Sequence, residues 1–387
     1  MKFDNQLRYA VQIIETFNGK MPLHSWLKFF FREHKQMGSK DRKQASEMVF
    51  CFYRLGLAAK DLSMEDRILT GLFLCNHSSN EILQYFKPSW NEHIGLKTEE
   101  KINFISNRIQ IPEIFPWTDQ LSDGINHSDF CASFLQQPDL FIRLRPGFEN
   151  AVKKKLISRS IPFREISATC LAFGNTTKLD ELIELNKEAV IQDLNSQKTG
   201  SFFEMPGDVS SEPVKVWDCC AGSGGKSIML YDIFPGVELT VSDIRESILA
   251  NLKNRFREAG IKKYRAIVTD LAKEQKEQET SSYDLIIADV PCSGSGTWGR
   301  NPDSIYFFDV RETERYQALQ KKILSNIIPV LKKGSVLVYI TCSVFKKENE
   351  DVVDFIQQKF SLRAEKMELL KGYDQKADSL FVARFTV

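Results

Sequence analysis

Two short stretches near the carboxyl end combine a cysteine with small polar neighbours. The first is Asp289-Val-Pro-Cys292-Ser-Gly-Ser-Gly, and the second is Tyr339-Ile-Thr-Cys342-Ser343. A thiolate is a strong nucleophile, and an activated cysteine often has a histidine beside it. All five histidines lie at or before His127, so residues 128–387 contain none. Chemistry in this region therefore cannot use a Ser-His or Cys-His pair, or a histidine metal ligand, unless the amino-terminal region reaches across.

The placement of the two cysteines favours a functional role over simple packing. An arbitrary cysteine is more often a small side chain that fills space. Cys292, however, lies in a Gly- and Ser-rich loop that has little reason to be buried. Both cysteines follow expected strands, at the edge where open α/β sheets bind ligands. The pattern indicates two thiols that converge on one crevice.

A third stretch, Asp218-Cys-Cys-Ala-Gly222-Ser-Gly-Gly-Lys226-Ser227, joins an expected strand to an expected helix. Glycines there let a ligand approach the backbone, and a helix amino terminus favours negative charge. It is not a Walker A motif, because position 220 is Cys, and it lacks the last glycine of the dinucleotide fingerprint. Asp243 ends the second strand, where a carboxylate can bind ribose hydroxyls, and Asp270 ends the third. The ordered set indicates an adenosine-containing cofactor.

Alternating strands and helices must position these residues. We expect strands over Val214–Asp218, Glu238–Asp243, Tyr264–Thr269, Tyr283–Val290, Ser335–Thr341 and Ser379–Val387. We expect helices from about Lys226, over Arg245–Ala259, and over about Arg311–Leu331 with Gly334 as its stop. This alternation predicts an α/β fold with a Rossmann-like, doubly wound parallel sheet.

The rest of the chain predicts two further domains. Residues 1–130 have helical periodicity, with Ser39 as a helix cap and Gly56 as a stop. Residues 131–205 predict a small α+β domain with a strand over Asp139–Arg145 and a helix over Glu149–Ser158, and residues 206–387 form the doubly wound domain. The polar stretch Lys273–Ser282 predicts a surface loop.

A basic stretch lies in the middle domain. This basic stretch runs from Arg143 to Arg164 and contains one acid, Glu149. Its seven basic residues are Arg143, Arg145, Lys153, Lys154, Lys155, Arg159 and Arg164. Such a stretch can bind phosphates. The alternative interpretation is a solvated helix face.

Composition excludes several classes of protein. The net charge is +1, with 42% hydrophobic and 27% charged residues, which is ordinary for a soluble globular protein. The first residues are too polar for a signal peptide, and no apolar run approaches the ~18 residues of a membrane span. Eight cysteines without a CxxC pair predict neither a disulfide framework nor a zinc ribbon. We expect a reduced, cytoplasmic, monomeric protein without a metal or a membrane partner.

The three stretches resemble the Sun/Fmu-type (NOL/NOP/Sun) RNA (cytosine-5) methyltransferases, which use S-adenosylmethionine. The resemblance is strongest in Asp289–Gly296 with Arg300-Asn-Pro-Asp303, and in Thr341-Cys342-Ser343 followed by Glu348-Asn349. It extends to Gln192-Asp-Leu-Asn-Ser-Gln197. Residues 38–54 are similar to the NusB-like helical domain of the bacterial ribosomal RNA members. One departure is the turn Gly222-Ser-Gly-Gly-Lys226, where the family usually has Ala-Pro-Gly-Gly-Lys.

The resemblance implies methyl transfer to carbon 5 of a cytosine in RNA, most directly 16S-type ribosomal RNA. It implies that Cys342 is the attacking nucleophile and that Cys292 assists release. Because DNA cytosine-5 enzymes use a Pro-Cys thiol as nucleophile, the swapped assignment stays open. Asp289 is expected to hydrogen-bond the cytosine ring edge. Lys226 is expected to supply positive charge near the target or the cofactor's carboxylate.

The binding residues follow from the same stretches. For the cofactor S-adenosylmethionine we expect Cys219, Cys220, Ala221, Gly222, Ser223, Gly224, Gly225, Lys226, Asp243, Arg245, Asp270 and Asp289. For RNA we expect Arg143, Arg145, Lys153, Lys154, Lys155 and Arg300.

Three other functions compete with this interpretation. An amino-methyltransferase would have a second proline and an aromatic residue after Asp289, and neither is present. A nicotinamide dehydrogenase would need the dinucleotide fingerprint and a histidine acid. A non-catalytic RNA-binding assembly factor that retains the fold is disfavoured by the intact Asp289, Cys292 and Cys342.

Overall fold

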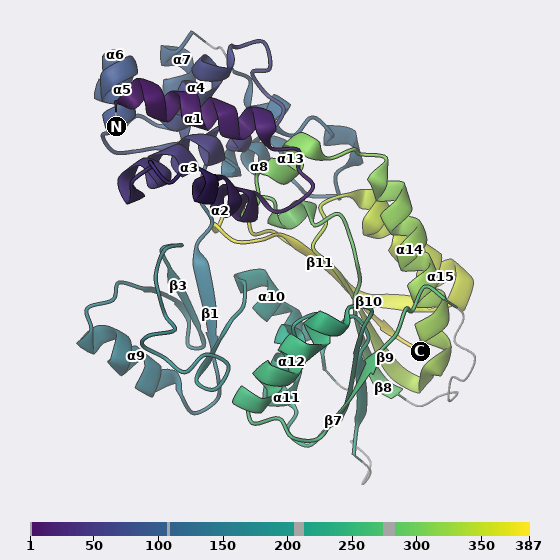
Figure 1. The fold of residues 1–387 in the computed structure, drawn as a ribbon. Helices are drawn as coiled ribbons and strands as arrows, with labels where there is room; N and C mark the ends of the chain where they lie inside the picture. Colours follow the sequence, from purple (N-terminus) through teal and green to yellow (C-terminus); the bar gives the residue numbers. More distant parts are fainter. Residues whose placement is uncertain (1, 107–108, 205–212, 274–282) are drawn as a thin grey trace. The chain divides into compact units, whose positions relative to one another are not determined.

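The computed structural model describes residues 2–106, 109–204, 213–273 and 283–387. It contains two compact units (Figure 1). Unit 1 comprises residues 1–119, 125–137 and 297–310, and unit 2 comprises residues 120–124, 138–296 and 311–387. The predicted boundary at residue 205 and all of the predicted loop Lys273–Ser282 except Lys273 lie outside the described residues. The division into domains 1–130, 131–205 and 206–387 stays a prediction.

Unit 1 is helical. Its α-helices are α1 (Phe3–Thr16), α2 (Leu23–Glu33), α3 (Ser39–Arg54), α4 (Met64–Cys75), α5 (Glu81–Phe86), α6 (Pro88–Glu92), α7 (Thr98–Phe104), α8 (His127–Ser133) and α13 (Asp303–Phe307). Ser39 is the first residue of α3, so the predicted cap is wrong by one position. Gly38 is the cap, and its N–H donates to the Asp41 carboxylate at 3.1 Å. Helices α3 and α4 pack closely because Gly71 has no side chain; a Cβ there would lie 2.5 Å from the carbonyl oxygen of Cys51.

A segment distant in sequence completes this helical core. The ring of buried Tyr53 lies 5.6 Å from that of Tyr306 and 6.0 Å from that of Phe307. Likewise the ring of Phe115 lies 6.0 Å from that of Trp298. Residues 297–310 are therefore a structural part of unit 1, although the chain on both sides of them belongs to unit 2.

Unit 2 contains two sheets. The smaller has the order β2-β3-β1-β4, is antiparallel, and carries helix α9 (Glu149–Ser158). Its strands are β1 (Leu140–Leu144), β2 (Arg164–Ser167), β3 (Cys170–Phe173) and β4 (Ala189–Ile191). The predicted strand and helix of this segment are both present.

The larger sheet has seven strands in the order β10-β11-β9-β8-β5-β6-β7. They are β5 (Lys215–Asp218), β6 (Glu238–Asp243), β7 (Tyr264–Val268), β8 (Tyr283–Asp289), β9 (Leu331–Thr341), β10 (Arg363–Leu370) and β11 (Leu380–Thr386). Strands β5 to β9 pair in parallel, whereas β10 and β11 are antiparallel to their neighbours. The predicted Rossmann-like α/β class is confirmed, and the sheet is mixed because of its last two strands.

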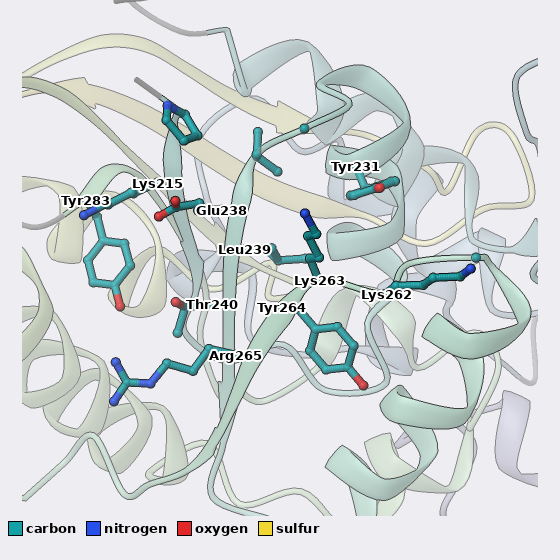
Figure 2. A pocket seen from close by; sticks show the side chains of 14 residues that line it. Lys215, Tyr231, Glu238, Leu239, Thr240, Lys262, Lys263, Tyr264, Arg265 and Tyr283 are labelled. Atoms are coloured by element: carbon teal, nitrogen blue, oxygen red, sulfur yellow. The ribbon is translucent and has the colours of Figure 1, made fainter. Parts of the chain in front are cut away.

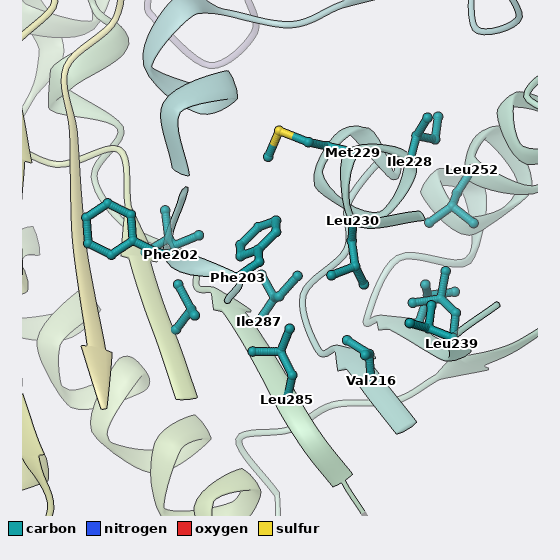
Figure 3. Close-up of a cluster of buried hydrophobic side chains, with 14 of the residues drawn as sticks. Phe202, Phe203, Val216, Ile228, Met229, Leu230, Leu239, Leu252, Leu285 and Ile287 are labelled. Carbon is teal, nitrogen blue, oxygen red and sulfur yellow. The ribbon is translucent and has the colours of Figure 1, made fainter. Parts of the chain in front are cut away.

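Helices cover both faces of this sheet. Successive residues of a strand point to opposite faces, so Leu285 and Ile287 belong to one buried cluster and Ile286 and Ala288 to the other. Figure 3 shows the first cluster, which packs against α11 (Gly225–Ile233) and α12 (Glu246–Glu258). The second packs against α14 (Glu312–Ile327) and α15 (Glu350–Phe360).

The helix predicted to reach Leu331 ends earlier. Helix α14 stops at Ile327 and a short 3-10 turn, Ile328–Val330, follows. Pro329 explains the difference, since proline lacks the N–H that the helix needs and clashes with the preceding turn. Gly334 is not a helix stop but lies within the span of β9, at φ +78°.

Candidate functional site

The two thiols of the sequence analysis lie together in unit 2. Cys292 follows β8 and Cys342 follows β9, and these strands are parallel neighbours, so their carboxyl ends meet at one edge of the sheet. The Sγ atoms of Cys292 and Cys342 are 3.3 Å apart, and both side chains are half-buried. The hydrogen bond to Cys342 and burial raise the pKa of the Cys292 thiol well above its ordinary value. Cys292 is therefore a protonated partner beside Cys342 at neutral pH.

An ion pair brings positive charge to the same place. The Nζ atom of Lys226, in the first turn of α11, donates to Asp289 Oδ2 at 2.7 Å. Burial opposes the charge of this ammonium group, but Asp289 and the neighbouring Cys342 raise the pKa of Lys226 above its ordinary value. Lys226 thus stays charged and places a positive charge near Cys342.

The glycine-rich turn lies between β5 and α11. Gly224 caps α11 at φ +83°, and a Cβ there would meet the Phe256 ring at 2.8 Å, so only glycine fits. A Cβ at Gly222 or Gly225 would meet nothing within 4 Å, so the space over the turn is open. Ser223 accepts a hydrogen bond from Arg255 at 2.8 Å.

The two cysteines of this turn differ. Cys219 is buried in the core cluster that packs against α14 and α15. The side chain of this predicted cofactor residue therefore faces the core. Cys220 is half-buried, and Ala221 donates its N–H to the Ser242 carbonyl at 2.9 Å.

Asp243 is held as a carboxylate at the end of β6. It accepts hydrogen bonds from the N–H of Gly222 at 3.1 Å and from Arg245 Nε at 3.0 Å. Burial acts against ionisation, but the hydrogen bonds and charge of Arg245 prevail and lower the pKa of Asp243. Asp270, after β7, accepts the Ala272 N–H at 3.1 Å and is half-buried.

Asp218, to which the sequence analysis assigned no role, is a buried acid beneath the turn. Its Oδ2 accepts from the Ser227 hydroxyl at 2.6 Å, whereas Oδ1 has no hydrogen-bond partner. Burial raises the pKa of Asp218 to about 7. The sequence does not reveal this residue, because an acid at a strand end looks the same in sequence whether it is buried or solvated.

The structure disfavours part of the predicted RNA-binding set. Arg143 and Arg145 are buried and both bind Asp232, with N–O distances of 2.7 Å. Asp232 offsets one of the two positive charges and holds both guanidinium groups inside unit 2, so in this conformation they do not reach an RNA phosphate.

Two of the three lysines in helix α9 are also paired with acids. Lys153 pairs with Glu165 at 2.5 Å and Lys155 with Glu188 at 2.7 Å, whereas Lys154 is exposed. Arg300 is half-buried and belongs to unit 1.

A separate cavity of about 770 Å³ lies at the opposite edge of the large sheet (Figure 2). Its lining includes residues from the amino ends of β5 to β8, such as Lys215, Glu238, Tyr264, Arg265 and Tyr283. None of the predicted site residues lines it.

In the described part of the chain, no helix combines the length and the apolar composition that a membrane span requires.

Comparison with known proteins finds relatives over the segment that contains the large sheet. Residues 209–384 match the family model described as 16S rRNA methyltransferase RsmB/F. The probable ribosomal RNA small subunit methyltransferase B of Bacillus subtilis is 31% identical over 175 residues, which is 45% of this chain and 38% of the relative. Ribosomal RNA small subunit methyltransferase B of Citrobacter koseri is 30% identical over 177 residues, 43% of this chain and 38% of the relative. The match thus spans less than half the length of these relatives.

Solved structures share the fold. The crystal structure of PH0851 superimposes with a TM-score of 0.71 at 17% identity, covering 100% of this chain and 99% of that one. NSun6 from Pyrococcus horikoshii, solved with SFG, gives 0.58 at 14% identity and covers 67% of this chain and 94% of its own.

The fold and the family match define a Rossmann-like methyltransferase domain. Residues 209–384 match the RsmB/F methyltransferase family model, which confirms the resemblance to Sun-type enzymes over this segment.

Proposed function

We propose that this protein transfers a methyl group to carbon 5 of a cytosine in RNA, with 16S-type ribosomal RNA as the substrate. The observation that carries the proposal is the contact between the Cys292 and Cys342 sulfur atoms, at 3.3 Å, near the Lys226–Asp289 ion pair. The methyltransferase family and the names of the relatives support ribosomal RNA as the substrate class.

Carbon 5 of cytosine is a poor nucleophile, and a thiolate can activate it. In the proposed first step, the Cys342 thiolate bonds to carbon 6, and the electron pair displaced from the ring double bond makes carbon 5 nucleophilic. The ammonium group of Lys226 places a positive charge near the attacking sulfur. Nitrogen 3 takes a proton from solvent as the thiolate adds and gives it back on release. While nitrogen 3 is protonated, the Asp289 carboxylate accepts its hydrogen bond and so stabilises the adduct.

S-adenosylmethionine, when bound, supplies the electrophilic methyl group. The residues of the turn fit such a ligand: the space over Gly222 and Gly225 is open, and Asp243 is a carboxylate positioned for ribose hydroxyls. Asp218 Oδ1, buried and without a hydrogen-bond partner, adds an unpaired polar atom beneath this turn. We propose the twelve cofactor residues of the sequence analysis, with Cys219 and Gly224 contributing through the backbone.

Release requires both thiols. The carbon 5 proton leaves to solvent, its electron pair reforms the ring double bond, and the carbon 6–sulfur bond breaks with its electrons on Cys342. The Cys292 thiol, protonated because of its raised pKa, hydrogen-bonds the departing sulfur. This assigns Cys342 to attack and Cys292 to release.

The target base must leave any stack to reach the thiols, which favours an unpaired or partly folded RNA segment. Lys154 is exposed and suited to a phosphate contact, and we retain Arg300 as a proposed contact from unit 1. The buried, ion-paired Arg143 and Arg145 are assigned instead to the structure of unit 2.

The test is methyl transfer from methyl-labelled S-adenosylmethionine to total RNA and to small ribosomal subunits from cells that lack the gene. We expect the label in 5-methylcytidine. Label in another nucleoside would overturn the two-thiol mechanism. No label on either substrate would leave the assembly factor as the better interpretation.

Variants of the two cysteines assign their roles. Cys342→Ala is expected to abolish methylation while equilibrium binding of S-adenosylmethionine stays near normal. Cys292→Ala is expected to accumulate a covalent RNA adduct that survives a denaturing gel. Cys75→Ala, in unit 1, is the matched control and should resemble the wild type. An adduct with Cys342→Ala instead would reverse the assignment.

A further inference from the structure

A buried carboxylate lies beneath the two thiol loops. Glu348 ends the short turn Lys346–Glu348 after β9 and is fully buried. Its Oε2 accepts the N–H of Ser293 at 2.7 Å, and its Oε1 accepts the hydroxyl of Ser343 at 2.7 Å. Ser293 follows Cys292 and Ser343 follows Cys342 in the chain. One carboxylate therefore binds the residue next to each thiol.

The serines extend this link between the loops. The Ser293 hydroxyl donates to Ser343 Oγ at 3.2 Å, and the hydroxyls of Ser295 and Ser343 lie 3.3 Å apart. Ser295 Oγ also accepts the N–H of Val344 at 2.9 Å. Removing the carboxylate would leave buried donors unpaired on both loops, which is costly.

Regular elements hold the carboxylate in place. Gln320, from α14, donates to Glu348 Oε2 at 3.3 Å and to the carbonyl of Pro291 at 3.0 Å. The hydroxyl of Tyr339, in β9, donates to the Glu348 carbonyl at 2.6 Å. Burial raises the pKa of Glu348, so the folded protein tolerates this acid only with several donors around it.

We infer that Glu348 is a positioning residue that clamps the two loops and holds the sulfur atoms of Cys292 and Cys342 in contact. Glu348 is fully buried, so it acts through Ser293 and Ser343 and touches no substrate. Its effect on turnover rests on the proposed function, whereas its effect on the distance between the thiols does not. In the proposed reaction, attack uses Cys342 alone and release uses both thiols. A loosened clamp therefore slows release more than attack.

The spacing of the thiols can be measured without RNA. Diamide, an azodicarboxamide oxidant, converts two thiols into a disulfide, and the two electrons and two protons reduce it to the hydrazine. The rate of the Cys292–Cys342 cross-link, quantified by mass spectrometry of the joined peptides, reports how often the sulfur atoms meet. Both cysteines are half-buried rather than fully enclosed.

Glu348→Gln keeps the shape of the side chain but replaces one acceptor oxygen by an NH₂ group that faces the Ser293 N–H or the Ser343 hydroxyl. We expect the cross-linking rate to fall about tenfold, since a misplacement of 1 Å can cost about 100-fold in rate. The matched control is Glu350→Gln. Glu350 is a half-buried acid two residues away that binds Ser122 Oγ at 2.9 Å and the Asp123 N–H at 3.1 Å, but neither thiol loop. The Glu350→Gln variant should cross-link at the wild-type rate.

A second variant covers the case in which Glu348→Gln does not fold. Ser343→Ala leaves the carboxylate in place and removes its link to the Cys342 loop, so it should slow cross-linking in the same way. If Glu348→Gln folds, the double variant should slow cross-linking by less than the two single effects combined, because both changes break the same link. A wild-type cross-linking rate in folded Glu348→Gln, or an equal loss in Glu350→Gln, would overturn the inference.

The RNA adduct supplies the catalytic readout. With competent substrate, Glu348→Gln should show more covalent adduct per turnover than the wild type, and Glu350→Gln should not. If the wild type methylates no RNA, the proposed function fails while the cross-linking result still decides the role of Glu348.

Discussion

At the scale of single residues, neighbours decide which form each charged group takes. Lys226 stays charged because Asp289 and Cys342 offset its burial, whereas burial leaves Asp218 with a pKa of about 7. Asp243 is equally close to the turn but is ionised through Arg245. Acids of similar sequence context thus differ in charge because of the donors around them.

Asp218 predicts a specific dependence of stability on pH. Between the ordinary pKa of 3.8 and about 7, the folded protein keeps a proton that the unfolded chain has lost. The stabilisation is complete below the lower value and is lost as pH rises through the upper one. Asp218 lowers the free energy of unfolding by up to about 1.4 kcal/mol per pH unit in this window. Asp218→Asn should remove that slope, as measured by urea unfolding at pH 5, 6 and 7.5.

The exposed Asp180 supplies the control. Asp180→Asn should give a curve parallel to that of the wild type. If the Asp218→Asn curve is also parallel, Asp218 is ionised throughout this range and the assignment is wrong.

Residue types and strand ends predicted which side chains meet, but not how they are held. Cys292, Cys342, Lys226 and Asp289 could be brought together from sequence, because parallel strands present their carboxyl ends at one edge. The role of Glu348 could not, since its contact with Ser293 joins loops 55 residues apart. For the same reason the burial of two arginines of the basic stretch could not be predicted: Asp232, which pairs with both, is 87 residues from Arg145.

At the scale of elements, the loop after β8 is hydrogen-bonded to two other segments through its backbone. The N–H of Gly296 donates to the Cys342 carbonyl at 2.8 Å, and its own carbonyl accepts the N–H of Ser379 at 2.9 Å. Gly296 thus joins the loop after β8, the loop after β9 and the start of β11. The strands that these segments border, β8, β9 and β11, were predicted from the sequence, but the contacts of Gly296 between them were not, because no periodic pattern encodes such contacts.

Gly296→Ala should disrupt this junction. A Cβ at this position would overlap the Ser379 carbonyl oxygen and lie 3.0 Å from that of Cys342. Backbone on both sides must move, so we expect a loss of about 1–3 kcal/mol in the free energy of unfolding, measured by urea denaturation. Gly95→Ala, where a Cβ meets nothing within 4 Å, should leave stability unchanged or slightly higher. Equal stabilities of the two variants would contradict the close packing.

At the scale of the whole molecule, an ionic link joins the two sheets of unit 2. Arg143 lies in β1 of the small sheet, and Arg145 directly follows that strand. Both pair with Asp232, which lies in α11, a helix that packs on the large sheet. Arg145 also donates to the Ala259 carbonyl at 2.8 Å, just beyond α12. The four-stranded sheet is therefore attached to the methyltransferase domain by buried charge as well as by chain connection.

Removing the acid of this link should destabilise unit 2 strongly. Asp232→Ala leaves two buried guanidinium groups without their counter-charge, which costs about 3–5 kcal/mol. Glu181→Gln, in an exposed pair with Lys178, should change stability by less than about 0.5 kcal/mol. Chemical denaturation of both variants tests this, and a small loss in Asp232→Ala would mean that water replaces the pair.

The order of the chain has a consequence for synthesis. Tyr53 and Phe115 leave the ribosome early, but the rings that complete their packing, Tyr306, Phe307 and Trp298, are made only after most of unit 2. At elongation rates of about 5–20 residues per second, this delay is on the order of 10–50 s. During that interval the nascent helices expose an unfinished aromatic surface to chaperones and to neighbouring chains. Unit 1 thus begins before unit 2 in this chain but is completed only after most of unit 2 has been made.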